Sequence, residues 1–238
     1  MRGYQYPLRL PPLRRLERED FMPGTANLAA LTFIESWPRW PAPTLVLQGP
    51  AGSGKSHLAN IWQERARAQR LDPARLAREE PRALLGNAKA LLVEDADRLL
   101  AVEPALGPAL YALHFALTER GGWLLLTARA APAHWQIALP DLRSRLVAAP
   151  TVAIGQPDDA LLATVLVKLL SDRQLECNAH VLSYLAPRVE RSLEAVQRLA
   201  DRLDAGAMAA RRRRRRVTLA LAKRVLRSLD GKIDDTMG

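Results

Sequence analysis

Two patterns of apolar residues divide the chain at about residue 155. Before that point, short apolar runs typical of buried strands alternate with longer segments of helical periodicity. After it, apolar residues recur every three or four positions, which predicts helices alone. Because buried strands separated by helices favour a parallel sheet, we predict an α/β unit with helices flanking the sheet, followed by a small all-α bundle.

The predicted elements are short and closely spaced. Residues 1–20 predict an extended tail, and residues 71–87 have no clear pattern. Strands are predicted at 44–48, 90–94, 123–127 and 151–154. Helices are predicted after Gly24, at 55–69, around 104–119 and in LPDLRSRL, and then four times after Gly155. In the third of these last helices one face carries Leu193, Val196, Leu199 and Leu203.

A glycine-rich stretch follows the first predicted strand and opens a helix. GPAGSGKS matches the pattern G-x-x-x-x-G-K-[ST] in full. Such glycines let backbone N–H groups surround phosphates, while the lysine adds a cation, the serine hydroxyl faces Mg²⁺ and the helix points its positive dipole end at the anion. A chance glycine-rich turn is disfavoured by the strand and the helix on either side. The predicted phosphate-binding residues are Gly49, Pro50, Ala51, Gly52, Ser53, Gly54, Lys55 and Ser56.

Two adjacent acids end the second strong strand. Glu94 and Asp95 fall at its carboxyl end, where open α/β sheets place ligands. We expect one to hold magnesium and the other to orient a water molecule, and the sequence leaves open which does which. The alternative is a charged strand end without a function.

Charge and cysteine content narrow the setting. The net charge is +10, and six of the basic residues form one run, Arg211, Arg212, Arg213, Arg214, Arg215 and Arg216. Such a run predicts weak, nonspecific contact with DNA or, equally well, a solvated turn between helices. The single cysteine, Cys177, and the lack of a signal peptide or an apolar run of about 20 residues predict a cytoplasmic protein without a membrane span. The four scattered histidines show no metal-ligand spacing.

These motifs, in this order, resemble those of the AAA+ ATPases, and in detail the DnaA-related family, which includes the initiator DnaA and the Hda-type regulatory inactivators of DnaA. The resemblance runs from about residue 4 to residue 228. DFMPGTANLAAL is similar to the segment beside the adenine, GPAGSGKSHLAN to the Walker A loop and LLVEDADRL to the Walker B strand. The family usually has Asp where this chain has Glu94.

Three more segments extend the resemblance. LLLTARAAP is similar to the sensor I strand, with Thr127 at its polar end, although Ala128 and Arg129 replace the acidic residue common there in the initiator. LPDLRSRL resembles the segment with the arginine finger, which implies that role for Arg145. RSLEAVQRL resembles the sensor II helix, which implies that Arg191 faces the phosphates. Each arginine alone would be taken for a surface residue.

The segment YQYPLRL near the start resembles the clamp-binding peptide of Hda-type proteins. Gln5 would be its anchor glutamine, and Leu8 and Leu10 its apolar anchors. Pro7 restricts the backbone, which lowers the cost of ordering on binding. The alternative is a tail with chance apolar residues.

The resemblance implies a regulator of replication initiation in a bacterial cytoplasm. Residues 1–20 would form a clamp-binding tail, 21–155 the AAA+ nucleotide-binding domain and 156–238 a helical lid. The chain would bind ADP or ATP with Mg²⁺, dock on the DNA polymerase sliding clamp and present Arg145 to the ATP held by DnaA, with weak or no ATPase of its own. Since the chain ends about ten residues after the last predicted helix, we expect no DNA-binding domain like that of the initiator.

Two other functions fit the same motifs. One is a self-contained AAA+ ATPase that acts as a helicase loader or as a single-stranded-DNA-binding replication factor. The other is a nucleotide-gated scaffold without a role in hydrolysis. The resident nucleotide and homo-oligomerisation stay open at this point.

Overall fold

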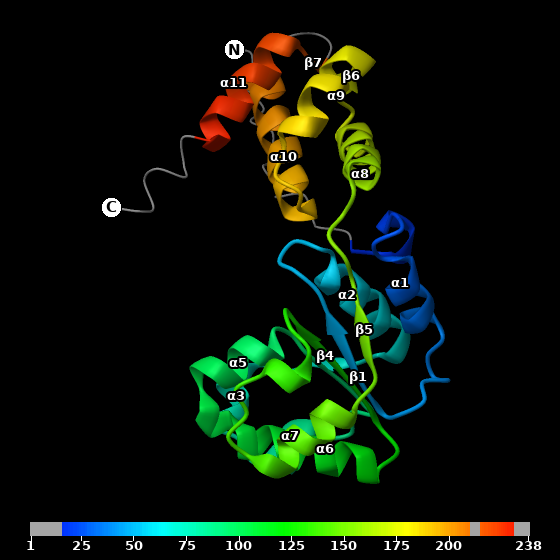
Figure 1. Cartoon of the computed structure of the whole chain (residues 1–238), viewed down its shortest axis with the longest axis vertical. Coiled ribbons are helices and arrows are strands. Elements are labelled where there is room, and N and C mark those ends of the chain that lie inside the picture. The colour runs from blue at the N-terminus through cyan, green and yellow to red at the C-terminus, as the bar shows by residue number, and fades with distance from the viewer. Residues whose placement is uncertain (1–15, 210–214, 231–238) are drawn as a thin grey trace, which may run out of the picture.

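A computed structural model describes residues 16–209 and 215–230. An α/β part forms one end of the molecule and a helical part, here called the lid, forms the other (Figure 1). One extended segment after residue 153 leads from the last strand of the sheet into the lid.

The sheet of the α/β part has five strands, all parallel, in the order β2-β3-β4-β1-β5. β1 lies between β4 and β5, and its residues Leu47 and Gln48 pair with Thr127 and Ala128 of β4. The predicted α/β fold with a parallel sheet flanked by helices is therefore confirmed. The strands are β1 (Thr44–Gln48), β2 (Gln69–Arg70), β3 (Ala90–Val93), β4 (Trp123–Ala128) and β5 (Thr151–Ala153).

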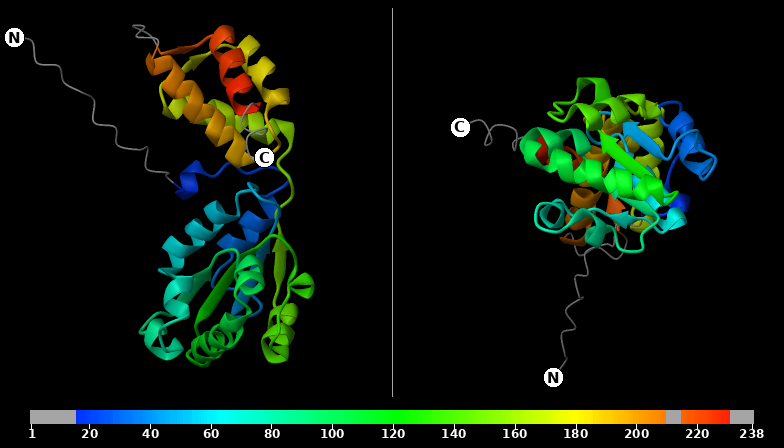
Figure 2. Two further views of the ribbon diagram at one scale, coloured as in Figure 1. Left: turned by 90° about the vertical axis from the view of Figure 1, so that its left-hand side faces the viewer. Right: turned by 90° about the horizontal axis from the view of Figure 1, so that it is seen from below.

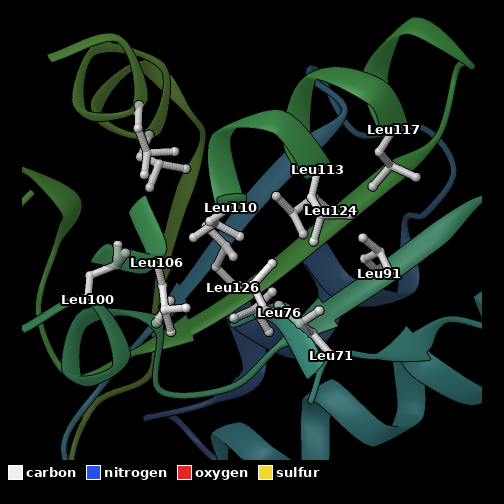
Figure 3. Close-up of a cluster of buried hydrophobic side chains, with 14 of the residues drawn as sticks. Leu71, Leu76, Leu91, Leu100, Leu106, Leu110, Leu113, Leu117, Leu124 and Leu126 are labelled. Atoms are coloured by element: carbon white, nitrogen blue, oxygen red, sulfur yellow. The ribbon is translucent and has the colours of Figure 1, made fainter. Parts of the chain in front are cut away.

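Helices cover both faces of the sheet, which is why its interior strands are mostly apolar. On one face, the leucines of α6 point at Leu124 and Leu126 of β4 (Figure 3). On the other face, Leu45 and Leu47 of β1 pack in a cluster with Trp62 of α2. The first face is covered by α3 (Pro73–Leu76), α4 (Pro81–Leu85), α5 (Ala96–Val102), η2 (Pro104–Leu106), α6 (Gly107–Glu119) and α7 (Pro140–Ala148), and the second by α1 (Leu28–Glu35) and α2 (Lys55–Ala66).

The lid has an apolar cluster of its own. It contains the predicted face of α10, because Val196, Leu199 and Leu203 are all buried there. Two-residue strands β6 (Glu176–Cys177) and β7 (Arg216–Val217) pair in parallel at one end of the bundle. The lid helices are α8 (Asp159–Asp172), α9 (Ala179–Leu185), η4 (Ala186–Arg188), α10 (Leu193–Ala209) and α11 (Leu219–Asp230).

The segment before α1 lies between the two parts (Figure 2). It includes η1 (Arg18–Asp20), and Asp20 accepts a hydrogen bond of 2.5 Å from Lys168 Nζ of α8. The Thr25 hydroxyl donates to Asp158 Oδ2 at 2.8 Å, and Asp158 also caps α8 by accepting from the Leu161 N–H at 2.7 Å. These bonds fix the start of the lid against the α/β part.

Local differences from the sequence predictions have local causes. The helix predicted at 55–69 ends at Ala66, because Arg67 adopts a left-handed conformation with φ of 50°. β3 ends at Val93, one residue earlier than predicted, since Asp95 already caps the next helix. Strand β2 and the pair β6–β7 were not predicted, because two residues are too few for an alternating pattern.

Within the described residues, no single helix is long and apolar enough to cross a membrane. One bent pair, Ala96–Val102 with Pro104–Glu119, meets the criterion by length and composition only, and its two segments meet at 113°. The pair contributes Leu100, Leu110 and Leu113 to the buried core of the α/β part.

Candidate nucleotide-binding site

The phosphate loop, defined here as Gly49–Ser56, joins the end of β1 to the first turn of α2. Gly52 and Gly54 have positive φ values of 68° and 101°, a conformation that other residues rarely adopt. At Gly49 the constraint is space, because a Cβ would lie 2.7 Å from the Ile154 carbonyl oxygen. Each glycine of the motif is therefore needed for the shape of the loop.

Lys55 is buried, and its ammonium group is turned back onto the loop. Its Nζ donates to the carbonyl oxygens of Gly49 and Pro50 at 2.7 and 2.8 Å. Burial lowers the pKa of Lys55, and the charges of Asp95 and Asp97 oppose that shift. Lys55 forms no ion pair with any described residue. Because an ammonium has three N–H donors, one remains for an anion.

Two further observations fit an anion at the loop. The Ser53 hydroxyl is buried and has no hydrogen-bond partner among the described residues. Ser56, in contrast, is exposed in the first turn of α2, where the helix dipole is positive. A buried cation, an unpartnered hydroxyl and a helix N-terminus thus lie within eight consecutive residues.

The two candidate acids have different surroundings. Glu94 pairs with Arg70 of β2, and its other oxygen is buried without a described partner. Asp95 is exposed and has a left-handed backbone with φ of 47°. Its negative charge raises the pKa of Lys55, against the larger effect of burial. Asp95 is therefore the acid coupled to the phosphate loop, while Glu94 is held on the side of β2.

Thr127 links the turn that carries Glu94 and Asp95 to strand β1. It is buried in β4, directly beside Leu47 of β1. Its hydroxyl oxygen accepts the Asp95 backbone N–H at 3.0 Å. The turn after β3 is thereby fixed relative to the end of β1, from which the phosphate loop starts.

The lid contacts the phosphate loop directly. The Leu193 N–H, at the start of α10, donates to the Gly52 carbonyl at 2.8 Å. A Cβ on Gly52 would lie only 2.7 Å from Ser192 Cβ. Arg191 precedes these residues, and its side chain is exposed and bonds to Asp159 Oδ2 at 3.1 Å. The sensor II segment is thus at the loop, with the arginine itself paired to the first turn of α8.

Comparisons with known proteins identify the architecture. Domain III of the Thermotoga maritima replication initiation protein DnaA matches with a TM-score of 0.74 and 18% identity, over 90% of this chain and 96% of that one. The FIGL-1 AAA domain matches with a TM-score of 0.61 and 16% identity, over 85% and 78%. The fold is that of an AAA+ domain.

A longer DnaA structure shares this AAA+ fold. The replication initiator DnaA bound to AMPPCP and single-stranded DNA matches with a TM-score of 0.65 and 17% identity. The match covers 77% of this chain and 62% of that chain, so this chain spans less than two thirds of its length. No protein-family model and no curated protein matches the sequence.

Arg145 lies over α6, on the side of the sheet where β1 begins. Its Cζ is 5.6 Å from the ring centroid of Tyr111 on α6. The pKa of His114 is lowered mainly by the burial of that histidine and, to a lesser extent, by the positive charge of Arg145. His114 shares a 2.9 Å hydrogen bond with Thr44, the first residue of β1. The phosphate loop starts after Gln48, the last residue of β1. Thr44 and Gln48 are four residues apart, which gives roughly 13 Å between the two ends of the strand at about 3.3 Å per residue. Arg145 is therefore remote from its own phosphate loop.

Some predicted residues lie outside the described ranges. These are the clamp-peptide residues Gln5, Leu8 and Leu10, together with Arg211, Arg212, Arg213 and Arg214. Of the rest of the arginine run, Arg216 is exposed on β7. Arg215 is only partly exposed, pairs with Asp204 and donates to the Arg173 carbonyl at 3.0 Å. Arg215 is therefore not the free cation that the run suggested.

Three features of the site escaped sequence inspection. Asp97 accepts the Arg129 N–H at 2.8 Å, and its other oxygen is buried without a described partner. Its spacing, two residues after Asp95, was the available indication. The roles of Arg70 and Ser192 had no such indication, because Arg70 pairs with Glu94 and Ser192 contacts Gly52, and both partners are distant in sequence. No group of three or more His, Cys, Asp or Glu side chains could hold a metal ion in the described parts of the chain, so magnesium here would depend on phosphate oxygens as ligands.

The contact between Gly52 and the lid can be tested with Gly52→Ala. The methyl group would clash with Ser192 and force alanine into a left-handed conformation, at a cost of about 1–2 kcal/mol. We expect amide hydrogen exchange at Leu193 to accelerate by about five- to thirtyfold, because its acceptor is the Gly52 carbonyl. Gly107→Ala is the control, since a Cβ there meets nothing within 4 Å. Unchanged exchange in Gly52→Ala would contradict this contact.

Proposed function

We propose that this protein is an adenine-nucleotide-dependent regulator of replication initiation, which stimulates ATP hydrolysis by DnaA through an arginine supplied in trans. The observation that carries the proposal is the separation of two sites along one strand. A phosphate loop follows the end of β1, and Arg145, which has no ion pair among the described residues, lies over Tyr111 near the His114 that bonds to the first residue of β1. One site serves the chain's own nucleotide and the other serves a neighbouring molecule.

Nucleotide binding is supported by the chemistry of the phosphate loop. Lys55 retains one N–H donor, and Ser53 has an unpartnered hydroxyl. The structural neighbour bound to AMPPCP has the same fold. We assign Thr127 and Arg191 to the same ADP or ATP site, because one fixes the turn after β3 and the other precedes the lid residues on Gly52.

Magnesium would be held by Ser56 together with Glu94 and Asp95, and when bound it would offset the negative charge of the phosphates. Asp95 is the acid that we assign to the loop side, because it acts on the charge of Lys55. Glu94 is partly neutralised by Arg70. The buried, unpartnered oxygen of Glu94 is consistent with a further cationic contact.

The proposed trans role of Arg145 is supported by its position and by its exposed side chain, which has no ion pair among the described residues. It lies over Tyr111 and near His114, which bonds to the first residue of β1, whereas the phosphate loop follows the last residue of that strand. An arginine presented to the ATP of another molecule stabilises the charge that develops on the γ-phosphoryl group. DnaA is the partner that we propose, on the resemblance of the motifs and the fold shared with its domain III.

The remaining partners are proposed from sequence alone. Gln5, Leu8 and Leu10 would bind the sliding clamp and so place the protein near newly replicated DNA. Arg211 to Arg214 and Arg216 would add weak, nonspecific DNA contact. A self-contained ATPase is the alternative, and steady-state hydrolysis that rises on single-stranded DNA without DnaA would favour it.

Lys55→Ala tests the nucleotide site. Loss of the cation should weaken binding of ADP or ATP at least tenfold, about 1.4 kcal/mol, as measured by calorimetry. Lys89→Ala is the control, because Lys89 is exposed and lies before β3, away from the loop. Equal affinities for Lys55→Ala and wild type would refute the assignment of the loop.

Arg145→Ala tests catalysis in trans. A finger supplied in trans is typically worth on the order of 10³–10⁵ in rate, so stimulation of DnaA should be lost while nucleotide binding is kept. Arg143→Ala is the matched control, because Arg143 is an exposed arginine of the same helix. Normal stimulation by Arg145→Ala, measured as phosphate release by DnaA, would exclude this residue as the finger.

Gln5→Ala with Leu8→Ala tests the clamp peptide. A buried leucine contributes about 1.5–3 kcal/mol, so the double change should lower affinity for the clamp by at least tenfold in surface plasmon resonance. Nucleotide binding and thermal stability should stay near wild type. Arg14→Ala with Arg15→Ala is the control in the same tail. Wild-type clamp affinity in the double variant would move the clamp contact to another surface.

A further inference from the structure

A basic groove lies on the lid, built from residues that the proposed nucleotide and trans sites do not use. It has a volume of about 530 Å³ and is lined by Tyr184 of α9, Arg188 of η4, and Lys223, Leu226 and Arg227 of α11. We call it the lid groove. Its volume is in the range that holds small-molecule ligands, and a nucleotide unit is of that size.

The cations of the lid groove lack acidic partners. No ion pair joins Arg188, Lys223 or Arg227 to any residue in the described ranges, and no lining residue is acidic. Other arginines of the lid behave differently, since Arg173 pairs with Asp201 and Arg198 with Glu194. Arg202, Arg216 and Arg224 also have no ion pair within the described ranges, but none of them lines this groove. What distinguishes Arg188, Lys223 and Arg227 is that they gather around one groove without an acidic residue.

Grouping these charges has a cost. Lys223 and Arg227 are four residues apart on α11, and like charges at that spacing face each other on a helix and destabilise it. Arg188 adds a third positive charge from another element. An anionic ligand that contacts all three would remove the repulsion, so the arrangement suits a binding surface better than a structural one.

The geometry places an aromatic ring among the cations. The Cζ of Arg188 is 4.1 Å from the ring centroid of Tyr184, and the Lys223 Nζ is 5.8 Å from the same centroid. Arg188 Nη1 also donates to the Tyr184 carbonyl at 2.9 Å, which holds the guanidinium in place. A planar guanidinium fixed in this way is preorganised for two hydrogen bonds to a phosphate.

We propose that the lid groove binds the phosphate backbone of a single-stranded nucleic acid. Cations that follow the backbone beside an aromatic side chain are the usual composition of single-strand sites. Within the described part of the lid, the exposed Arg216 is a further cation, but it does not line the groove. This site is separate from the arginine run and does not depend on nucleotide binding at the phosphate loop.

The test uses the full-length protein and a fluorescein-labelled 20-residue oligothymidine, with anisotropy measured across a salt series. The groove variant carries Arg188→Gln, Lys223→Gln and Arg227→Gln. Each phosphate contact to a single strand contributes about 0.7 to the slope of log affinity against log salt, so the slope should fall by about 2. Affinity at low salt should fall at least tenfold. The single variant Lys223→Gln should lower the slope by about 0.7.

A matched control separates the groove from net charge. Arg39→Gln, Arg67→Gln and Lys89→Gln remove three exposed cations that lie on the α/β part and have no described ion pairs. This control should bind almost as wild type. A third protein, with Arg211 to Arg214 changed to glutamine, should keep salt-dependent binding that Lys223→Gln weakens further. Thermal melting by circular dichroism verifies that each variant is folded.

Four results would overturn the proposal. Equal losses in the groove and control variants would show a general charge effect. Loss of all binding when the arginine run alone is neutralised would place the site there. Competition by polyglutamate as strong as by oligothymidine would indicate an acidic protein partner. Displacement of the oligonucleotide by inorganic phosphate at millimolar concentration would indicate a site for free phosphate.

Discussion

The close approach of the lid to Gly52 is the constraint on which the site depends. A residue with a side chain at this position would meet Ser192, and most residues would resist the left-handed backbone. With glycine there, the first turn of α10 donates to the loop carbonyl. This contact couples the shape of the phosphate loop to the position of the lid, which the bonds from Lys168 to Asp20 and from Thr25 to Asp158 also hold.

Strand β1 extends that constraint to the remainder of the α/β part. Its three middle residues, Leu45 to Leu47, are apolar and buried against both faces, so its ends are held at fixed positions. Thr127 and Asp95 are aligned with one end of the strand through the register of β4. Thr44 and His114 form the buried polar pair at the other end, close to Arg145. The sheet thus separates the two proposed functional ends without a flexible connection.

Much of this could be predicted from the sequence where local pattern and structure coincide. The apolar run TLVLQ and the motif GPAGSGKS each occupy consecutive residues, so the strand, the loop and the first residue of the helix were predicted correctly. The pairing of Glu94 with Arg70 could not be predicted, because β2 is two residues long and its partner is 24 residues away. The position of Arg191 also required coordinates, since an arginine two residues from the loop contact points instead at Asp159.

Helix α10 connects the phosphate loop to the far end of the lid. It has 17 residues, which at about 1.5 Å per residue gives a rod of roughly 25 Å. Its first turn is bonded to the phosphate loop, and its last residue, Ala209, comes two positions before Arg211, the start of the arginine run in sequence. A tilt of about 10° at the base of such a rod would displace its far end by roughly 4 Å. Because coupling between two binding sites is reciprocal, a ligand that holds the C-terminal end of α10 would change nucleotide affinity at the phosphate loop by the same free energy by which nucleotide changes the affinity for that ligand.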